Sequence, residues 1–200
     1  FLHSMARNPR AAPALRLLPL VRSMYAWRVS LSHGTTRRLA SNSASSSRWK
    51  QRHQNDPYVR KATQNGYRSR AAFKLLELDE KLGLLRPGLL ALELGSAPGS
   101  WTQLLVARRI STVAVDSLPM DPLDSTCHVV EGDFTCTQVQ QELLKEIAAR
   151  DPAGVDMVLS DASPNRSGVK SLDQARFTGM IEDIMLLTRR CVKPGGLLVA

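Results

Sequence analysis

Residues 91–101 constrain the fold of this chain more than any other stretch. An apolar run ends at Glu93 and Gly95, a Pro-Gly turn follows, and apolar helix-forming residues begin at Trp101. This order is typical of a buried parallel strand that leads through a loop into a helix, because glycine tolerates positive φ and lets a ligand approach the backbone. Open α/β sheets bind ligands outside the carboxyl ends of their strands. The segment therefore predicts a ligand-binding loop, or else a strand–turn–helix corner that binds nothing.

The loop sequence limits the kind of ligand. It contains neither G-x-G-x-x-G nor G-x-x-x-x-G-K-[ST], which disfavours a dinucleotide and a nucleoside triphosphate. Carboxylates near the loop would repel a pyrophosphate, whereas a nucleoside without phosphates is compatible with them. S-adenosylmethionine meets this requirement, and we expect it as the cofactor.

Strand-like and helix-like segments alternate from residue 69 onward. This alternation predicts an α/β fold with a mostly parallel sheet and helices on both faces. We expect helices over residues 69–85, 101–109, 139–150 and 172–192, and strands over 89–94, 112–115, 127–130, 155–159 and 197–200.

Four acidic residues lie at or just beyond the ends of successive predicted strands. They are Glu93, Asp116, Asp133 and Asp161. Because parallel strands end at one rim of the sheet, we expect these carboxylates to gather there. Asp116 would accept hydrogen bonds from a ribose diol, Asp133 would meet an adenine amino group, and Asp161 would reach a substrate. Each acid taken singly is more often a helix cap or a solvated loop residue, and it is the pattern of four on successive strands that favours a site.

The first 50 residues differ in charge from the rest. They contain nine Arg or Lys residues and no Asp or Glu, so the other 150 residues carry 18 basic and 18 acidic side chains. An Arg-rich, Ser-rich segment without acids predicts a mitochondrial or plastid transit peptide, with a basic nucleic-acid-binding arm as the alternative. We predict a transit peptide and Ser-rich linker over residues 1–50 and one folded domain over 51–200. No membrane span is expected, since no apolar stretch is long enough.

The three cysteines give no sign of a metal site. Cys127, Cys136 and Cys191 are scattered, and no C-x-x-C pair occurs. We therefore expect no bound metal and no disulfide scaffold.

Five motifs together resemble one known family. They are Y-R-S-R-A-A-F-K-L at 67–75, E-L-G-S-A-P-G-S-W at 93–101, D-S-L-P-M-D-P at 116–122, G-D-F at 132–134 and L-S-D-A-S-P-N at 159–165. In order and spacing they resemble the FtsJ-type ribosomal RNA 2′-O-ribose methyltransferases, most closely the mitochondrial members that act on a uridine of the large-subunit RNA. The resemblance implies a Rossmann-like S-adenosylmethionine-dependent methyltransferase fold.

The resemblance also implies roles for particular residues. The catalytic positions are Lys74 and Asp161. The cofactor-binding positions are Gly95, Pro98, Gly99, Trp101, Asp116, Asp133 and Asp161. Ser100 departs from the family pattern, which commonly has a second glycine there, and Ser163 stands where methionine is common. Four basic residues before the Lys74 helix would bind RNA phosphates or form an ordinary solvated surface: Arg60, Lys61, Arg68 and Arg70.

The family pattern continues past Ala200. It places a second catalytic lysine at about the next position and a glutamate further on, so we expect this chain to lack the C-terminal strands and to be inactive by itself. The implied function is 2′-O-methylation of a uridine in mitochondrial large-subunit ribosomal RNA. The alternative is a non-catalytic mitochondrial ribosome-assembly factor with the same fold. The expected partner is large-subunit ribosomal RNA or a pre-ribosomal particle, with a monomeric protein in the mitochondrial matrix.

Overall fold

A central parallel sheet organises the chain in the computed structural model, which describes residues 16–17 and 56–200. Within these residues six strands form the sheet in the order β1-β6-β5-β2-β3-β4, and each neighbouring pair is parallel. The strands are β1 (Arg16–Leu17), β2 (Leu90–Leu94), β3 (Ser111–Asp116), β4 (Cys127–Glu131), β5 (Val155–Ser160) and β6 (Val192–Val199). The helices are α2 (Pro57–Gln64), α3 (Ala72–Leu82), α4 (Ser100–Ala107), α5 (Thr137–Arg150) and α6 (Lys170–Cys191). The predicted transit peptide and linker lie outside the described residues, apart from the two residues of β1.

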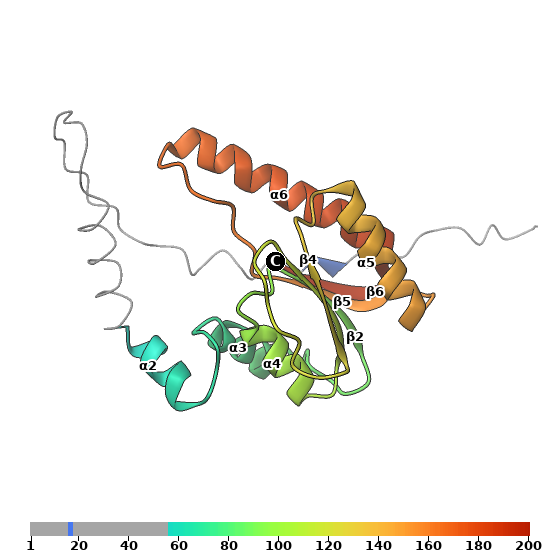
Figure 1. Ribbon diagram of the computed structural model, residues 1–200, viewed down its shortest axis with the longest axis horizontal. Helices are drawn as coiled ribbons and strands as arrows, with labels where there is room; N and C mark the ends of the chain where they lie inside the picture. Colours follow the sequence, from blue (N-terminus) through green and yellow to red (C-terminus); the bar gives the residue numbers. More distant parts are fainter. Residues whose placement is uncertain (1–15, 18–55) are drawn as a thin grey trace, which may run out of the picture.

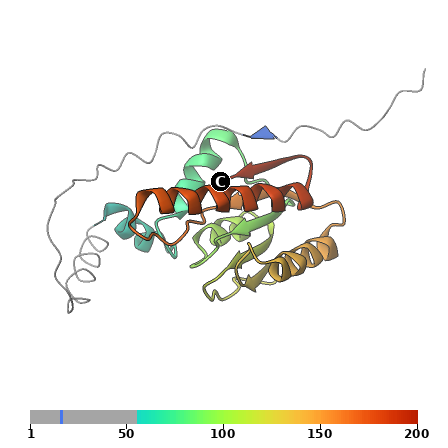
Figure 2. The same ribbon diagram turned by 90° about the horizontal axis from the view of Figure 1, so that it is seen from above.

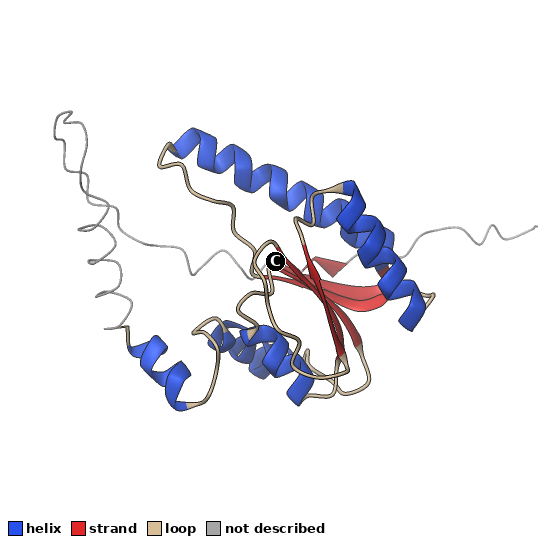
Figure 3. Cartoon of the chain, viewed as in Figure 1, coloured by secondary structure: helices blue, strands red, loops and turns tan. Residues whose placement is uncertain are grey.

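Helices cover both faces of the sheet, as Figures 1 and 3 show. On one face α5 and α6 contribute Leu143 and Leu187 to a core that includes Leu92 of β2. On the other face α3 and α4 contribute Leu75 and Leu105 to a second core. Figure 2, which looks from above, shows the long helix α6 running across the described part of the molecule. Successive strand residues point to opposite faces, so a strand with helices on both sides is buried along its whole length, as β2 is.

The strand order reverses at β2, and this reversal positions the site. The chain runs from β2 outward to β3 and β4, and then crosses back so that β5 pairs with the other edge of β2. β6 follows beside β5. The loops after β2 and β5 therefore leave the sheet next to each other at its carboxyl end, where open α/β sheets bind ligands. The predicted parallel sheet with helices on both faces is confirmed.

The helix predicted over residues 69–85 is shorter in the structure. Residues before it form a turn in which the Ser69 hydroxyl accepts a backbone N–H two residues later, at 3.2 Å. The helix stops at Gly83, which has φ 60 and donates its N–H to the Asp79 carbonyl. A left-handed glycine is a common helix end. Lys74 consequently lies in the first turn of α3.

Helix α2 was not predicted from the sequence. The Asp56 side chain accepts the Tyr58 N–H at 2.9 Å, and Pro57 occupies the first helical position. Both are established helix-start signals. α2 lies against α3 through an aromatic contact, because the ring of Tyr58 lies 5.9 Å from that of Phe73. The ring of Tyr67, in the segment between the two helices, lies 5.8 Å from the same Phe73 ring.

Strand β6 begins earlier than the predicted residues 197–200. It first pairs at Val192, opposite Val155, and an irregularity then separates this pair from the rest of the ladder. Lys193 of this irregular segment donates to Asp156 at 2.8 Å and lies 2.8 Å from Asp151. The amino end of the sheet is therefore tied together by charged side chains, while the opposite end carries the loops of the site.

Candidate functional site

The glycine loop (residues 95–99) joins β2 to α4 at the point where the strand order reverses. Gly95 and Gly99 have φ values of 78° and 99°, which favour glycine. The Gly95 N–H donates to the Val115 carbonyl at 2.9 Å and so ties the loop to the end of β3. A Cβ on Gly95 would lie 2.8 Å from Cα and Cβ of Ala162, in the loop after β5. The two loops are thus in contact, with no room for a side chain between them.

Asp116 lies at the end of β3, beside the glycine loop. One carboxylate oxygen accepts the Ala97 N–H at 2.9 Å, and the other accepts the Leu118 N–H at 2.8 Å. The carboxylate therefore fixes the glycine loop and the loop after β3 at once. A carboxylate offers about four acceptor positions, so each oxygen can still accept from a ribose diol. The predicted ribose-binding role is compatible with this geometry.

A buried hydroxyl in the glycine loop tests whether the site suits the predicted cofactor. Among the described residues, Ser96 Oγ is the one buried side-chain oxygen or nitrogen without a hydrogen-bond partner. An unpaired buried polar group costs about 1–3 kcal/mol, so such groups are uncommon without a functional reason. An unpaired hydroxyl next to a strand-end carboxylate and a tight glycine turn suits a polar nucleoside that carries no phosphate.

Asp133 follows β4 and stabilises a local turn. Its Oδ1 accepts both the backbone N–H and the hydroxyl of Thr135, at 2.9 and 2.8 Å. The side chain is exposed and comes shortly before α5. The structure thus gives Asp133 a turn-stabilising contact, and its contact with adenine stays a prediction.

Of the four acids expected to gather at the rim, Glu93 is buried beneath it, near the carboxylates of Asp116 and Asp161. It lies within β2, is 1% exposed, and accepts the Thr102 hydroxyl at 2.7 Å. Burial raises the pKa of Glu93 to about 8. The hydrogen bond from Thr102 lowers this pKa, whereas the negative charges of the nearby Asp116 and Asp161 raise it further. Loss of hydration disfavours a buried carboxylate, so Glu93 is a mostly neutral group at pH 7, buried beneath the glycine loop.

Three neighbouring positions predicted to contact the cofactor, Pro98, Gly99 and Trp101, differ in exposure. Pro98 is exposed and Gly99 is buried. Trp101 is buried in the core between α3 and α4, and its indole N–H donates to the Ala71 carbonyl at 2.8 Å. The structure therefore shows Trp101 as a packing residue, and a cofactor contact by Trp101 stays a prediction.

Lys74 and Asp161 meet across the site although 87 residues separate them in the sequence. Lys74 Nζ lies 2.7 Å from Asp161 Oδ1, with the two side chains 49% and 27% exposed. Lys74 comes from the first turn of α3, and Asp161 directly follows β5 beside the glycine loop. The two residues predicted to be catalytic thus form an ion pair that is open to solvent on one side.

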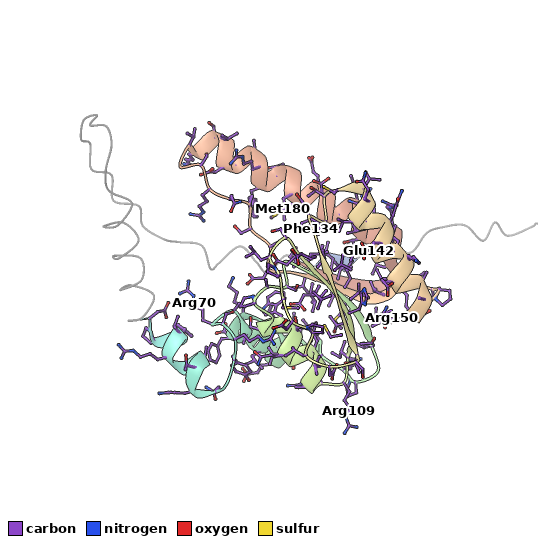
Figure 4. All side chains as sticks on the ribbon, viewed as in Figure 1. Arg70, Arg109, Phe134, Glu142, Arg150 and Met180 are labelled. Carbon is purple, nitrogen blue, oxygen red and sulfur yellow. The ribbon has the colours of Figure 1, made fainter. Side chains whose placement is uncertain are left out.

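The four basic residues predicted to face RNA have several local partners. Arg70 forms an ion pair with Asp56 at the start of α2, on the side of the molecule where Figure 4 labels it. Lys61 Nζ lies 4.9 Å from the centre of the Phe73 ring. Arg68 donates to backbone carbonyls beside the glycine loop. All four side chains are exposed, and Arg60 and Lys61 lie on α2.

Sequence reasoning missed the polar residues that join α4 to its surroundings. Gln103 accepts the Arg68 N–H at 2.7 Å and donates to the Gly66 carbonyl at 3.1 Å. Thr102 is the hydroxyl partner of Glu93. The only signal was that both are polar residues within an apolar helix. Ser100, which departs from the family pattern, bonds the Ser69 hydroxyl at 2.8 Å.

The described residues offer neither a metal site nor a membrane span. In the part of the chain that the structure describes, no group of three or more His, Cys, Asp or Glu side chains is arranged to hold a metal ion. None of the helices in residues 56–200 combines the length and apolar character needed to cross a membrane. Cys127 and Cys191 are buried free thiols, and burial raises their pKa values to about 11 and about 12.

Comparison with known proteins places the chain in a family. The FtsJ-like methyltransferase family matches residues 67–200. Ribosomal RNA large subunit methyltransferase E of Verminephrobacter eiseniae is 44% identical over 155 residues, which span 76% of this chain and 62% of that protein. The protein of the same name from Stutzerimonas stutzeri is 44% identical over 157 residues, 77% of this chain and 74% of that protein. The crystal structure of a ribosomal RNA methyltransferase from Plasmodium falciparum has a TM-score of 0.59 and 28% identity, and the match covers 66% of this chain and 76% of that one. The chain therefore belongs to the FtsJ-like methyltransferase family, which uses S-adenosylmethionine as its methyl donor.

Proposed function

We propose that this protein methylates the ribose 2′-hydroxyl of a uridine in mitochondrial large-subunit ribosomal RNA. The observation that carries the proposal is the ion pair between Lys74 and Asp161, 2.7 Å apart beside the glycine loop. One member of the pair comes from α3 and the other from the end of β5, so the fold itself assembles them at the carboxyl end of the sheet. The names of the curated relatives support ribosomal RNA as the substrate.

The proposed reaction is a direct methyl transfer that needs no covalent bond between substrate and protein. S-adenosylmethionine supplies a methyl group on a sulfonium, which is a strong leaving group. In the transfer, the hydroxyl oxygen would bond to the methyl carbon as the carbon–sulfur bond breaks, and the hydroxyl proton would pass to a general base, a role that the resemblance gives to the lysine expected after Ala200. In this proposal Asp161 and Lys74 orient the hydroxyl and balance charge as that proton departs. Placing the nucleophile against the methyl group accounts for much of such a rate enhancement.

The strand register supports a further catalytic position next to Asp161. Leu159 of β5 pairs with Val199 of β6. If this parallel register continues in a longer chain, the position after Ala200 falls opposite Asp161. The resemblance implies a lysine at about that position. Lys74, Asp161 and this lysine would then surround the same hydroxyl.

RNA would approach over α2 and α3. Arg60 and Lys61 are exposed on α2, and Lys74 is half exposed at the start of α3. Positive side chains along the approach to the site would neutralise backbone phosphates and release counterions. This predicts binding that weakens steeply as salt is raised.

We further propose a mitochondrial location, supported by the charge of residues 1–50, with nine basic and no acidic side chains. A fusion of residues 1–50 to a fluorescent protein should accumulate in mitochondria. A matched fusion in which the arginines are replaced by glutamine should remain in the cytosol. Diffuse or nuclear fluorescence of the first fusion would contradict import.

A methyl-transfer assay tests the proposed activity. Large-subunit ribosomal RNA is incubated with S-adenosylmethionine carrying a tritiated methyl group, and the product is hydrolysed in alkali, which cannot cleave next to a 2′-O-methyl ribose. We expect no transfer by the chain of residues 1–200 and transfer by a version extended through the family's lysine and final strands. Lys74→Ala in the extended version is the inactive control. Binding of cofactor and RNA without any methylation by the extended version would favour the assembly-factor alternative.

A further inference from the structure

The Arg68 side chain joins the two loops that border the cofactor site. Its Nη1 donates to the Pro98 carbonyl of the glycine loop at 3.1 Å and to the Asp121 carbonyl of the loop after β3 at 3.3 Å. The first loop is held by Asp116 through Ala97, and the second begins at Asp116 itself. A single guanidinium therefore contacts both loops, which the Asp116 carboxylate also contacts through the Ala97 and Leu118 N–H groups.

The glycine loop is shaped to admit this guanidinium. A Cβ on Gly99 would lie 2.7 Å from Arg68 Nη1 and 2.7 Å from the Met120 sulfur. Gly99 also has φ 99, a conformation that other residues adopt only with strain. The backbone turn thus favours glycine, and a Cβ in its place would also have to displace the ends of the flexible Arg68 and Met120 side chains.

The backbone that carries Arg68 is fixed to α4 and leads directly into α3. Four hydrogen bonds connect residues 66–71 to the first turn of α4. They are Arg68 N–H to Gln103 at 2.7 Å, Gln103 to Gly66 at 3.1 Å, Ser69 to Ser100 at 2.8 Å, and Trp101 to Ala71 at 2.8 Å. α3 begins at the next residue and carries Lys74 in its first turn. Residues 66–71 therefore contact α4 and lead directly into the helical turn that carries Lys74.

We propose that Arg68 is a positioning residue that couples cofactor binding to the placement of Lys74. It holds the glycine loop and the loop after β3 at a fixed separation, and it transmits their state through residues 66–71 to α3. It touches neither the reacting atoms nor the RNA in this role. The inference rests on the proposed function, because Lys74 matters only if the site transfers a methyl group.

Two substitutions at Arg68 and one matched control test the coupling. Arg68→Met removes the guanidinium and keeps an unbranched apolar stem, whereas Arg68→Lys retains a positive donor that can reach a carbonyl. Arg86→Met is the control. Arg86 is also an exposed arginine that donates to a backbone carbonyl, that of Gly83 at 3.2 Å, but it lies away from both loops. We expect S-adenosylmethionine, titrated by calorimetry, to bind about tenfold more weakly to Arg68→Met. Binding to Arg68→Lys should stay within about threefold of the unchanged chain, and binding to Arg86→Met within about twofold.

Hydrogen exchange followed by mass spectrometry measures the coupling directly. In the unchanged chain, saturating S-adenosylmethionine should slow exchange in residues 66–74 as well as in the glycine loop. In Arg68→Met, at cofactor concentrations that saturate it, protection should remain in the glycine loop and be lost in residues 66–74. Unaltered affinity in Arg68→Met, or undiminished protection of residues 66–74 in it, would overturn the proposal. Both readouts are independent of methyl transfer, so an extended chain that never methylates RNA would overturn the proposed function and leave the loop coupling standing.

Discussion

Replacing Gly95 by alanine tests whether the contact between the two loops at the strand reversal defines the cofactor site. Gly95 has φ 78, and a left-handed conformation costs a residue with a Cβ about 1–2 kcal/mol. The added methyl carbon would also lie 2.8 Å from Cα and Cβ of Ala162 and 2.9 Å from its nitrogen. These are backbone or near-backbone atoms, so a whole loop must move. Overpacking of this kind costs about 1–3 kcal/mol.

The two contributions together predict that Gly95→Ala lowers the free energy of unfolding by about 2–5 kcal/mol. Gly88 offers a matched control, because it has φ 84 but nothing within 4 Å of the place where an added Cβ would lie. Gly88→Ala should therefore cost only the backbone contribution of about 1–2 kcal/mol. The difference between the two variants isolates the contact with Ala162.

Urea unfolding of both variants measures that difference, and calorimetric titration with S-adenosylmethionine measures its effect on the site. We expect Gly95→Ala to bind the cofactor more than tenfold more weakly and Gly88→Ala to bind as the unchanged chain does. If the two variants were equally stable and bound the cofactor equally well, the contact between the loops could not be what shapes the site.

Three further predictions concern the acidic and basic residues of the site. Asp116→Ala should weaken S-adenosylmethionine binding by about 1.5–3 kcal/mol, because it removes the proposed charge-assisted hydrogen bonds to the ribose. It also leaves the Ala97 and Leu118 N–H groups without their acceptor. Unchanged affinity by calorimetry would contradict the assignment. In a chain extended past Ala200, Lys74→Ala and Asp161→Ala should each lower kcat far more than they raise KM for RNA, since their proposed role lies in the transition state; a change confined to KM would assign them to RNA binding instead. Burial raises the pKa of Glu93 from 4.5 to about 8, so between these values the folded protein keeps a proton that the unfolded chain has lost. The free energy of unfolding should therefore fall by about 1.4 kcal/mol per pH unit across that interval, and Glu93→Gln should remove this slope in urea unfolding; identical slopes would show that Glu93 is ionised when folded.

The sequence was sufficient for the parallel sheet because its strands are buried on both faces and read as short apolar runs. β2, β3 and β5 were predicted to within one residue at each end, and the positions of Asp116 and Asp161 follow from where β3 and β5 stop. Glu93 shows the limit of that reasoning. Its place in the sequence, two residues before the glycine loop, resembles a rim position, but the alternation of a strand turns its side chain inward to Thr102.

The polar contacts between distant segments could not be predicted from the sequence. Arg68 was identified as basic and hence as a candidate for phosphate binding. Its contacts with Pro98 and Asp121 depend on how the loops fold back, which no local pattern encodes. Helix α2 is a different case, since Asp56 followed by Pro57 is a local start signal that could have been recognised.

The position of β2 in the middle of the sheet has a consequence for how the protein is synthesised. One edge of β2 pairs with β3, which follows it closely in the chain. The other edge pairs with β5, which is synthesised much later and ends at Ser160. Until the ribosome has released that strand, a nascent chain holds the leucine-rich β2 with an unpaired edge, which is a ready template for pairing with another chain. Pausing of translation before β5 emerges should therefore favour aggregation or chaperone capture, whereas a pause of the same length after β6 should have little effect.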